Sequence, residues 1–353
     1  MKVGLIIYGS LDTVSGGYLY DRKLVDYLRS QGDTVEVISL PWRNYAAHLT
    51  DNFRFKLPQN LDILIQDELN HPSLIVANLG KHPYPIISLV HHLRCSELRP
   101  NWQNTLYGML EKKYLESVDG FIFNSETTRK VVHGITDQRK PSMVGYPPTD
   151  QFGEPMSEDE IILRAKGQEL KILFLGNVIE RKGLHILLEA VKGLKSNVKL
   201  DIVGSLNSDP VYTKRIQGII SANHLSSFVF LHGPMEKAPL IEKMRQAHIL
   251  AVPSSYEGYG IVYLEGMSFG LPAIGTTAGA ASEIITEGID GFLIEPENVA
   301  MLQSRLRILN EKRDILIRMG LAACERYLRQ PTWGETAGQI REFLLKQIKD
   351  LFV

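Results

Sequence analysis

Cysteine is scarce in this chain of 353 residues, which contains only Cys95 and Cys324. Two thiols so far apart in sequence form neither a disulfide framework nor a metal-binding cluster, so we expect a reducing compartment. An excess of charge of one sign is also missing, because the formal net charge is −1. A nucleic-acid-binding surface usually requires a basic excess, and we therefore expect no nucleic-acid partner.

Long hydrophobic runs are absent as well. No segment approaches the roughly 18 apolar residues that a membrane-spanning helix requires. The apolar run within MKVGLIIYGS (1–10) is too short for a secretory signal, and no small-residue cleavage site follows it. The sequence is therefore expected to be soluble and cytoplasmic, with at most peripheral contact at the inner face of a membrane.

What the chain does contain is an alternation of short apolar runs and helical patterns. Each apolar run is typical of a strand buried in a parallel sheet. The runs lie at residues 2–9, 34–40, 61–67, 85–92, 120–125 and 140–148, and again at 171–177, 199–205, 228–234, 248–255, 271–277 and 291–296. The alternation predicts an α/β fold with two doubly wound, Rossmann-like domains that face each other across a central cleft.

A segment rich in proline and charge separates the two series of strands. Within it, Ser157 and Glu160 have the spacing of a capping box, which predicts the start of a short helix. We place the N-terminal domain at 1–152 and the second domain at 153–332. The remaining residues, 333–353, have the pattern of an amphipathic helix that packs on protein.

Two loops that follow predicted strands carry features suited to an anion. Gly16 and Gly17 precede a predicted helix, where exposed backbone N–H groups can bind a phosphate, although a purely structural turn is the alternative. Arg181 and Lys182, in GNVIERKG, stand at the predicted start of another helix. Positive charge there opposes the helix dipole, which favours a bound anion over a simple solvated pair.

A third loop, YEGYG, precedes a predicted helix that contains an acidic residue among apolar neighbours. Gly258 and Gly260 allow a ligand to approach the backbone closely. Glu265 lies one to two turns into the helix, and a carboxylate can bind a ribose diol as it does in dinucleotide sites. With Lys182 on a diphosphate and Glu257 facing the group beyond it, the pattern predicts a nucleoside diphosphate site. The alternative is that Glu265 pairs with a buried cation.

The segment PSSYEGYG…GFLIEP (253–296) resembles the donor site of the retaining glycosyltransferases of family 4, which have the GT-B fold. Glu257 and Glu265, separated by seven residues, match the signature of that family. The preceding segment LFLGNVIERKGLHILLEAV (173–191) is similar in order and spacing. The N-terminal half resembles the acceptor domain of the family more loosely, and 333–353 resembles its terminal helix, which crosses back to the N-terminal domain.

The resemblance implies a role for each matching residue. Glu265 would hold the ribose hydroxyls, and Glu257 would contact the transferred sugar as one of two catalytic residues. The other is His91, which matches the active-site histidine after an N-terminal strand, although His92 beside it leaves the choice open. Lys182 matches the phosphate-binding lysine.

The remaining donor-binding positions follow from the same resemblance. They are Gly16, Gly17, Asn177, Arg181, Gly258, Tyr259, Gly260 and Ile261. Asn177 departs from the family, which has an arginine at this position. Arg181, in the adjacent turn, is the residue able to replace that charge.

The implied activity is transfer of a hexosyl group from a nucleotide-diphosphate sugar to an acceptor hydroxyl with retention of anomeric configuration, in glycan biosynthesis. No Asp-x-Asp pair of the kind used by metal-dependent transferases occurs in a loop, so we expect no metal and no other cofactor. Glycan, lipid-linked and small-molecule acceptors all stay open, as do the sugar and the base. Two alternatives also stay open: a nucleotide-sugar 2-epimerase on the same architecture, and a non-catalytic sugar-nucleotide-binding subunit.

Overall fold

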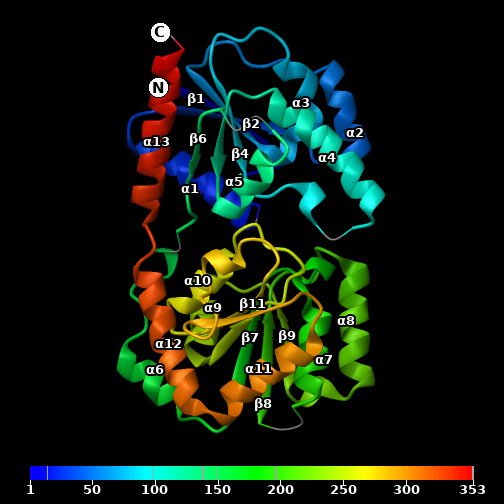
Figure 1. Ribbon diagram of the computed structural model, residues 1–353, viewed down its shortest axis with the longest axis vertical. Coiled ribbons are helices and arrows are strands. Elements are labelled where there is room, and N and C mark those ends of the chain that lie inside the picture. The colour runs from blue at the N-terminus through cyan, green and yellow to red at the C-terminus, as the bar shows by residue number, and fades with distance from the viewer. Residues whose placement is uncertain (14, 98, 137–138, 149, 195–196, 352–353) are drawn as a thin grey trace. The chain divides into compact units, whose positions relative to one another are not determined.

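The computed structural model of the chain describes residues 1–13, 15–97, 99–136, 139–148, 150–194 and 197–351. It divides into two compact units (Figure 1). Unit 1 comprises Met1–Pro148 and Pro331–Val353, and unit 2 comprises Thr149–Gln330. The chain thus passes between the units a few residues before the predicted domain boundaries.

Unit 1 is built on six parallel strands in the order β2-β1-β3-β4-β5-β6. The strands are β1 (Lys2–Tyr8), β2 (Thr34–Leu40), β3 (Ile63–Asp67), β4 (Ile86–Val90), β5 (Gly120–Phe123) and β6 (Ser142–Val144). The helices are α1 (Gly16–Ser30), α2 (Tyr45–Leu49), α3 (His71–Asn78), α4 (Asn101–Glu116), α5 (Glu126–His133) and α13 (Trp333–Asp350). Strands β3, β4 and β5 are buried along their whole length, as expected of a parallel sheet covered by helices on both faces.

Helix α13 belongs to unit 1 although it lies at the other end of the chain. It packs along α1, as Figure 1 shows in red and blue. Its apolar face is buried through residues such as Ile340 and Leu344. Arg341 donates two hydrogen bonds to the buried carboxylate of Asp33, from Nε at 2.7 Å and Nη2 at 3.2 Å. The predicted amphipathic helix that packs on protein is therefore confirmed.

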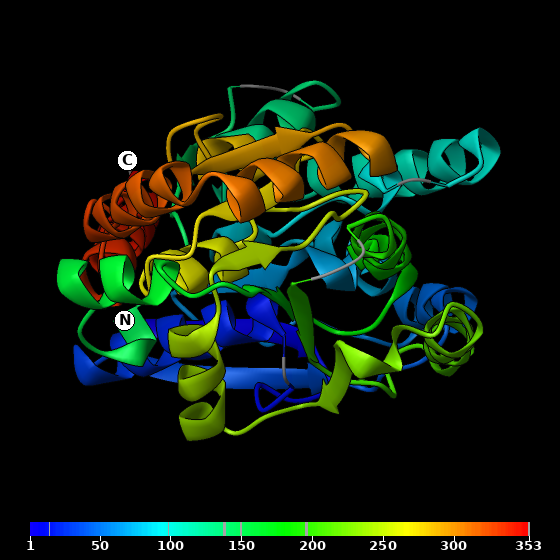
Figure 2. The same ribbon diagram turned by 90° about the horizontal axis from the view of Figure 1, so that it is seen from below.

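Unit 2 has a second sheet of six parallel strands, in the order β12-β11-β10-β7-β8-β9. The strands are β7 (Leu170–Leu175), β8 (Val198–Val203), β9 (Val229–Gly233), β10 (Ile249–Ala251), β11 (Ala273–Thr276) and β12 (Gly291–Ile294). The helices are α6 (Glu158–Ala165), α7 (Leu184–Lys192), α8 (Pro210–Ala222), α9 (Lys237–Gln246), α10 (Ile261–Met267), α11 (Val299–Glu311) and α12 (Arg313–Leu328). Helix α6 begins with the predicted capping box of Ser157 and Glu160, and α11 lies alongside β12 (Figure 2).

Both sheets reverse their strand order once. The reversal falls between β1 and β3 in unit 1, and between β7 and β10 in unit 2. Ligands of open α/β sheets bind outside the carboxyl ends of the strands at such a point. The two parallel sheets confirm the predicted α/β class with two doubly wound domains. A ligand is therefore expected at the loops that follow the strands at the two reversals. None of the helices in the described ranges has the length and apolar character needed to cross a membrane.

Candidate functional site

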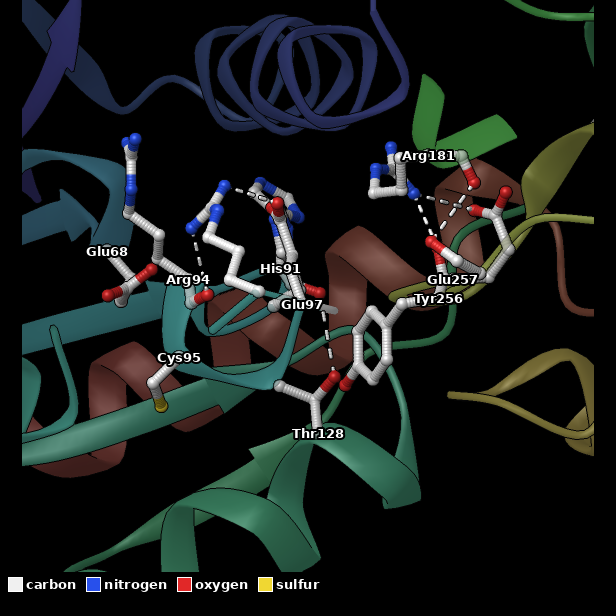
Figure 3. A network of polar contacts seen from close by, with 12 residues as sticks. Glu68, His91, Arg94, Cys95, Glu97, Thr128, Arg181, Tyr256 and Glu257 are labelled. Carbon is white, nitrogen blue, oxygen red and sulfur yellow. Dashed lines mark hydrogen bonds and ion pairs between the residues drawn. The ribbon is translucent and has the colours of Figure 1, made fainter. Parts of the chain in front are cut away.

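The loop after β10 carries a buried carboxylate that meets cations from the loop after β7. Glu257 is only 5% exposed. Lys182 Nζ lies 2.5 Å from Glu257 Oε1, and the hydroxyl of Ser254 donates to the same oxygen at 2.6 Å. Arg181 Nη1 lies 3.8 Å from Glu257 Oε2 (Figure 3). The two loops at the reversal of the unit 2 sheet are thus joined by an ion pair.

The ionisation of this pair is set by its surroundings. Burial alone would raise the pKa of Glu257, but the charges of Lys182 and Arg181, with hydrogen bonds from Lys182 and Ser254, lower its pKa to about 2. Burial lowers the pKa of Lys182, and the charges of Glu257 and Glu265 oppose that decrease. Glu257 is therefore an ionised carboxylate at neutral pH, held by a lysine whose charge is partly desolvated.

Glycine at position 183 allows the two loops to approach each other. Gly183 has φ of 68°, and a Cβ atom there would lie 2.1 Å from the carbonyl oxygen of Pro253. It also corrects one expectation, because Arg181 and Lys182 do not lie in the first turn of a helix. They lie in the 3-10 turn η5 (Glu180–Lys182), and helix α7 begins at Leu184, since the left-handed conformation of Gly183 separates the two elements.

Glu265 occupies the second turn of α10 and is 7% exposed. Its charge opposes the decrease that burial causes in the pKa of Lys182, so the two side chains are close enough for their charges to interact. The helix starts after Gly260, whose φ is 95° and where a Cβ atom would lie 2.6 Å from the ring of Tyr263. The structure therefore brings together four of the predicted donor-site side chains: Arg181, Lys182, Glu257 and Glu265.

Other predicted donor-binding residues have structural partners. The side-chain oxygen of Asn177 accepts a hydrogen bond from the backbone of Ser205 at 3.3 Å, which links the loops after β7 and β8. The hydroxyl of Tyr259 donates to Gln330 Oε1 at 3.3 Å. Gly258, in the YEGYG loop, and Ile261, the first residue of α10, are partly exposed.

In unit 1 the predicted residues Gly17 and His91 lie side by side. A Cβ atom at Gly17 would lie 3.3 Å from His91 Cδ2, and Gly16 is the first residue of the same helix, α1. His91 follows β4, and its Nε2 lies 3.2 Å from Asp21 Oδ1. His92 pairs with Glu97 at 3.1 Å. Of the two histidines, His91 is the one that lies beside Gly17. Gly16 and Gly17 were expected to precede the helix, but they are its first two residues, because Ser15 caps the helix.

Sequence reasoning missed three acidic or polar residues that contact the predicted ones. Ser254 binds Glu257, and Asp21 binds His91. Asp67, at the end of β3, lies within 4.8 Å of both Asp21 and His91 when the nearest ligand atoms are compared. Asp21 could have been found, because it occupies the buried face of α1 between Tyr18 and Leu24, where an apolar residue is expected.

Two groups in unit 1 have the residue types of a metal site: Asp21–Asp67–His91, and Glu68–His71–Glu111. In the second group both histidine nitrogens already have partners, because Nδ1 lies 3.1 Å from the carbonyl oxygen of Glu68 and Nε2 lies 2.8 Å from the hydroxyl of Tyr45. Glu111 accepts the backbone N–H of Arg94 at 2.5 Å. The side chains of this second group therefore have structural partners, and Glu111 holds the segment after β4.

Comparison with known proteins agrees with this geometry. Residues 156–325 match the family model described as "Glycosyl transferases group 1". An uncharacterized glycosyltransferase of Methanocaldococcus jannaschii is 34% identical over 141 residues, which is 40% of this chain and 38% of the relative. A D-inositol 3-phosphate glycosyltransferase of Xylanimonas cellulosilytica is 26% identical over 153 residues, 41% of this chain and 37% of the relative. The chain therefore spans about two fifths of the length of these relatives.

Solved structures resemble the whole chain. Sucrose-phosphate synthase from Thermosynechococcus elongatus has a TM-score of 0.82 at 18% identity and covers 99% of both chains. HepE from Anabaena, in complex with UDP-glucose, has a TM-score of 0.77 at 18% identity over 98% of this chain and 100% of its own. At this identity the likeness establishes the fold, which is that of the GT-B glycosyltransferase structures.

Proposed function

We propose that this chain is a glycosyltransferase of the retaining family-4 type, which transfers a hexosyl group from a nucleotide-diphosphate sugar to an acceptor hydroxyl without a metal ion. The observation that carries the proposal is the cluster in which Lys182 and Arg181 meet the buried glutamates Glu257 and Glu265 at the strand-order reversal of unit 2. The match of residues 156–325 to the glycosyl transferase group 1 model supports it. So does the UDP-glucose complex of HepE.

The cluster suits the charge changes of glycosyl transfer. Breaking the bond between an anomeric carbon and a diphosphate develops positive charge on the sugar and negative charge on the leaving group. Lys182 and Arg181 are preorganised cations that would stabilise the departing diphosphate, together with the backbone N–H groups of Gly258 to Ile261. Glu265 would hold the ribose hydroxyls. Glu257 would keep Lys182 in place and accept hydrogen bonds from the transferred sugar.

Unit 1 supplies the acceptor site and His91 in this proposal. Gly16 and Gly17, at the start of α1, would contact the donor phosphates, and His91 would contact an oxygen of the donor. The acceptor is a glycan, a lipid-linked glycan or a small molecule with a free hydroxyl. The absence of a metal requirement predicts that turnover persists in EDTA, and retention predicts that the anomeric configuration of the product, read by NMR coupling constants, equals that of the donor.

The proposal is tested by thermal unfolding of the purified chain with UDP, GDP, ADP and their glucose conjugates. A ligand at a hundred times its dissociation constant stabilises the folded state by about 2.7 kcal/mol. The stabilising donor is then incubated alone and with candidate acceptors, while nucleotide release is measured. Stabilisation with nucleotide release supports the proposal. Stabilisation without release would favour the non-catalytic subunit, C2 inversion of the free donor would favour the epimerase, and no stabilisation by any nucleotide would contradict all three.

A further inference from the structure

His91 is held by a buried aspartate that sequence reasoning did not single out. Asp21 lies on α1 and is 0% exposed. Its Oδ1 lies 3.2 Å from His91 Nε2, while its Oδ2 has no hydrogen-bond partner among the residues that the structure describes. A buried carboxylate with an unsatisfied oxygen is costly unless a cation lies beside it. Among the described residues, the ring nitrogen that contacts Asp21 is Nε2 of His91, which can supply this positive charge.

We propose that Asp21 is a positioning residue, which fixes the His91 ring with Nε2–H donated to Asp21 and Nδ1 presented to an oxygen of the bound donor. The proposal rests on the proposed function for the identity of the ligand. His91 keeps 15% of its side chain exposed. Within the described residues no hydrogen bond involves Nδ1, so this nitrogen is the one left for a ligand.

Neighbouring side chains restrict the orientation of the ring. The Tyr20 ring meets the His91 ring edge to face, with centroids 5.3 Å apart and an interplanar angle of 79°. Tyr20 is itself fixed, because its hydroxyl donates to the Gly145 carbonyl at 2.8 Å and its ring meets Trp333 at 5.4 Å. A Cβ atom at Gly17 would lie 3.3 Å from His91 Cδ2, so even a methyl group at position 17 would press on the ring. The ring is thus packed between fixed neighbours and directed at Asp21.

The surrounding charges favour the protonated ring. Burial alone would lower the pKa of His91, but the hydrogen bond and charge of Asp21 on α1, the charge of Asp67 at the end of β3 and that of Glu68 in η2 (Glu68–Asn70) outweigh it and raise the pKa. A protonated ring carries hydrogen on both nitrogens. His91 can then donate from Nε2 to Asp21 and from Nδ1 to a donor oxygen, without any transfer of a proton.

The test is NMR titration of the histidine side chains in the ligand-free chain, with the His91 signal assigned by the variant His91→Gln. The wild type is expected to show His91 titrating above the ordinary value of about 6.5. Its neutral form should carry hydrogen on Nε2. Asp21→Asn, which keeps an acceptor but removes the charge, should lower the midpoint by about one unit or more. Asp26→Asn, an exposed change on the same helix, is the matched control and should leave the His91 midpoint unchanged.

A pH–rate profile with the donor then tests whether activity depends on the protonated His91 ring. Activity that needs the protonated ring is lost as pH rises through the His91 pKa, so the alkaline limb should move to lower pH in Asp21→Asn and stay in place in Asp26→Asn. A wild-type His91 that titrates at or below about 6.5, or carries hydrogen on Nδ1 when neutral, overturns the proposal even if Asp21→Asn does not fold. An unchanged midpoint in a folded Asp21→Asn overturns it too. Because the titration needs neither donor nor acceptor, its result is separate from failure of the proposed transferase activity.

Discussion

The two units place their candidate sites at the strand-order reversals of their sheets but differ in the charged groups that lie there. In unit 2, Arg181 and Lys182 meet the carboxylate of Glu257, and its pKa falls to about 2. In unit 1, the carboxyl groups of Asp21, Asp67 and Glu68 lie around the imidazole of His91. Burial and the charge of Asp21 raise the pKa of Asp67, and the carboxyl groups together raise the pKa of His91.

The contrast shows how one architecture can hold two different sets of charged groups at the same point of a sheet. Two cations held at fixed positions suit a diphosphate, because their positive charge stabilises the negative charge of that group. An acidic cluster around a histidine suits a protonated hydrogen-bond donor instead. Substitutions that remove these charged groups should therefore have different effects on activity and stability in the two units.

The largest effect is expected from Lys182→Met, which removes the buried cation of unit 2. Loss of one preorganised donor to the leaving group should lower turnover roughly 100- to 1000-fold. It also leaves Glu257 buried without its lysine, which should destabilise the fold by about 3–5 kcal/mol. Initial rates and urea unfolding measure both effects.

The double variant Lys182→Met with Glu257→Gln separates the two consequences. Removing both charges should restore much of the stability but none of the activity. Lys192→Met is the control at an exposed position, where the lysine pairs with Glu189, and it should change neither stability nor activity. Full activity in the single variant would contradict the assignment of Lys182 to the diphosphate.

Acid should weaken unit 2 through Glu257. Its folded pKa, about 2, lies below the unfolded value near 4.5. The stabilisation is therefore complete above pH 4.5 and is lost as pH falls towards 2, by about 3 kcal/mol in total. Urea unfolding at pH 6, 5, 4 and 3 should show a shallower pH dependence in Glu257→Gln than in the wild type. Equal slopes would mean that the carboxylate is not held by its cations.

A smaller effect is expected from Glu265→Gln, which retains the shape of the side chain but not its charge. Hydrogen bonds to a charged group contribute about 1.5–3 kcal/mol, so donor affinity should fall about 10- to 100-fold. Calorimetric titration with the nucleotide diphosphate alone measures this loss. The exposed Glu311→Gln, at the end of α11, is the control that should bind normally.

Two glycine substitutions in unit 2 should have opposite signs. Gly183→Ala forces a left-handed residue to carry a Cβ atom against the Pro253 carbonyl, and it should lower the free energy of unfolding by about 1–3 kcal/mol. Gly218→Ala, within α8 and with open space around it, should raise it by about 0.5–1 kcal/mol. A loss of stability in both variants would mean that the contact between position 183 and the Pro253 carbonyl does not explain the effect of Gly183→Ala.

The same contrast explains what the sequence could and could not predict. Strands such as β1 and β7, and the position of Glu265 in a helix, are local patterns, and they were predicted closely. The pairing of Asp21 with His91 joins residues 70 positions apart and depends on how α1 lies over the ends of the strands. Asn177 binds Ser205 because the glycines after β7 and β8 touch, since a Cβ atom at Gly204 would lie 2.0 Å from the Gly176 carbonyl. Such partners follow from tertiary packing, which local patterns do not encode.

A crystal structure of the chain with the nucleotide sugar selected by thermal unfolding tests the central claim most directly. We predict that the diphosphate lies on Arg181 and Lys182, with the ribose hydroxyls on Glu265. A nucleotide bound to unit 2 away from these residues, or bound only to unit 1, would contradict it.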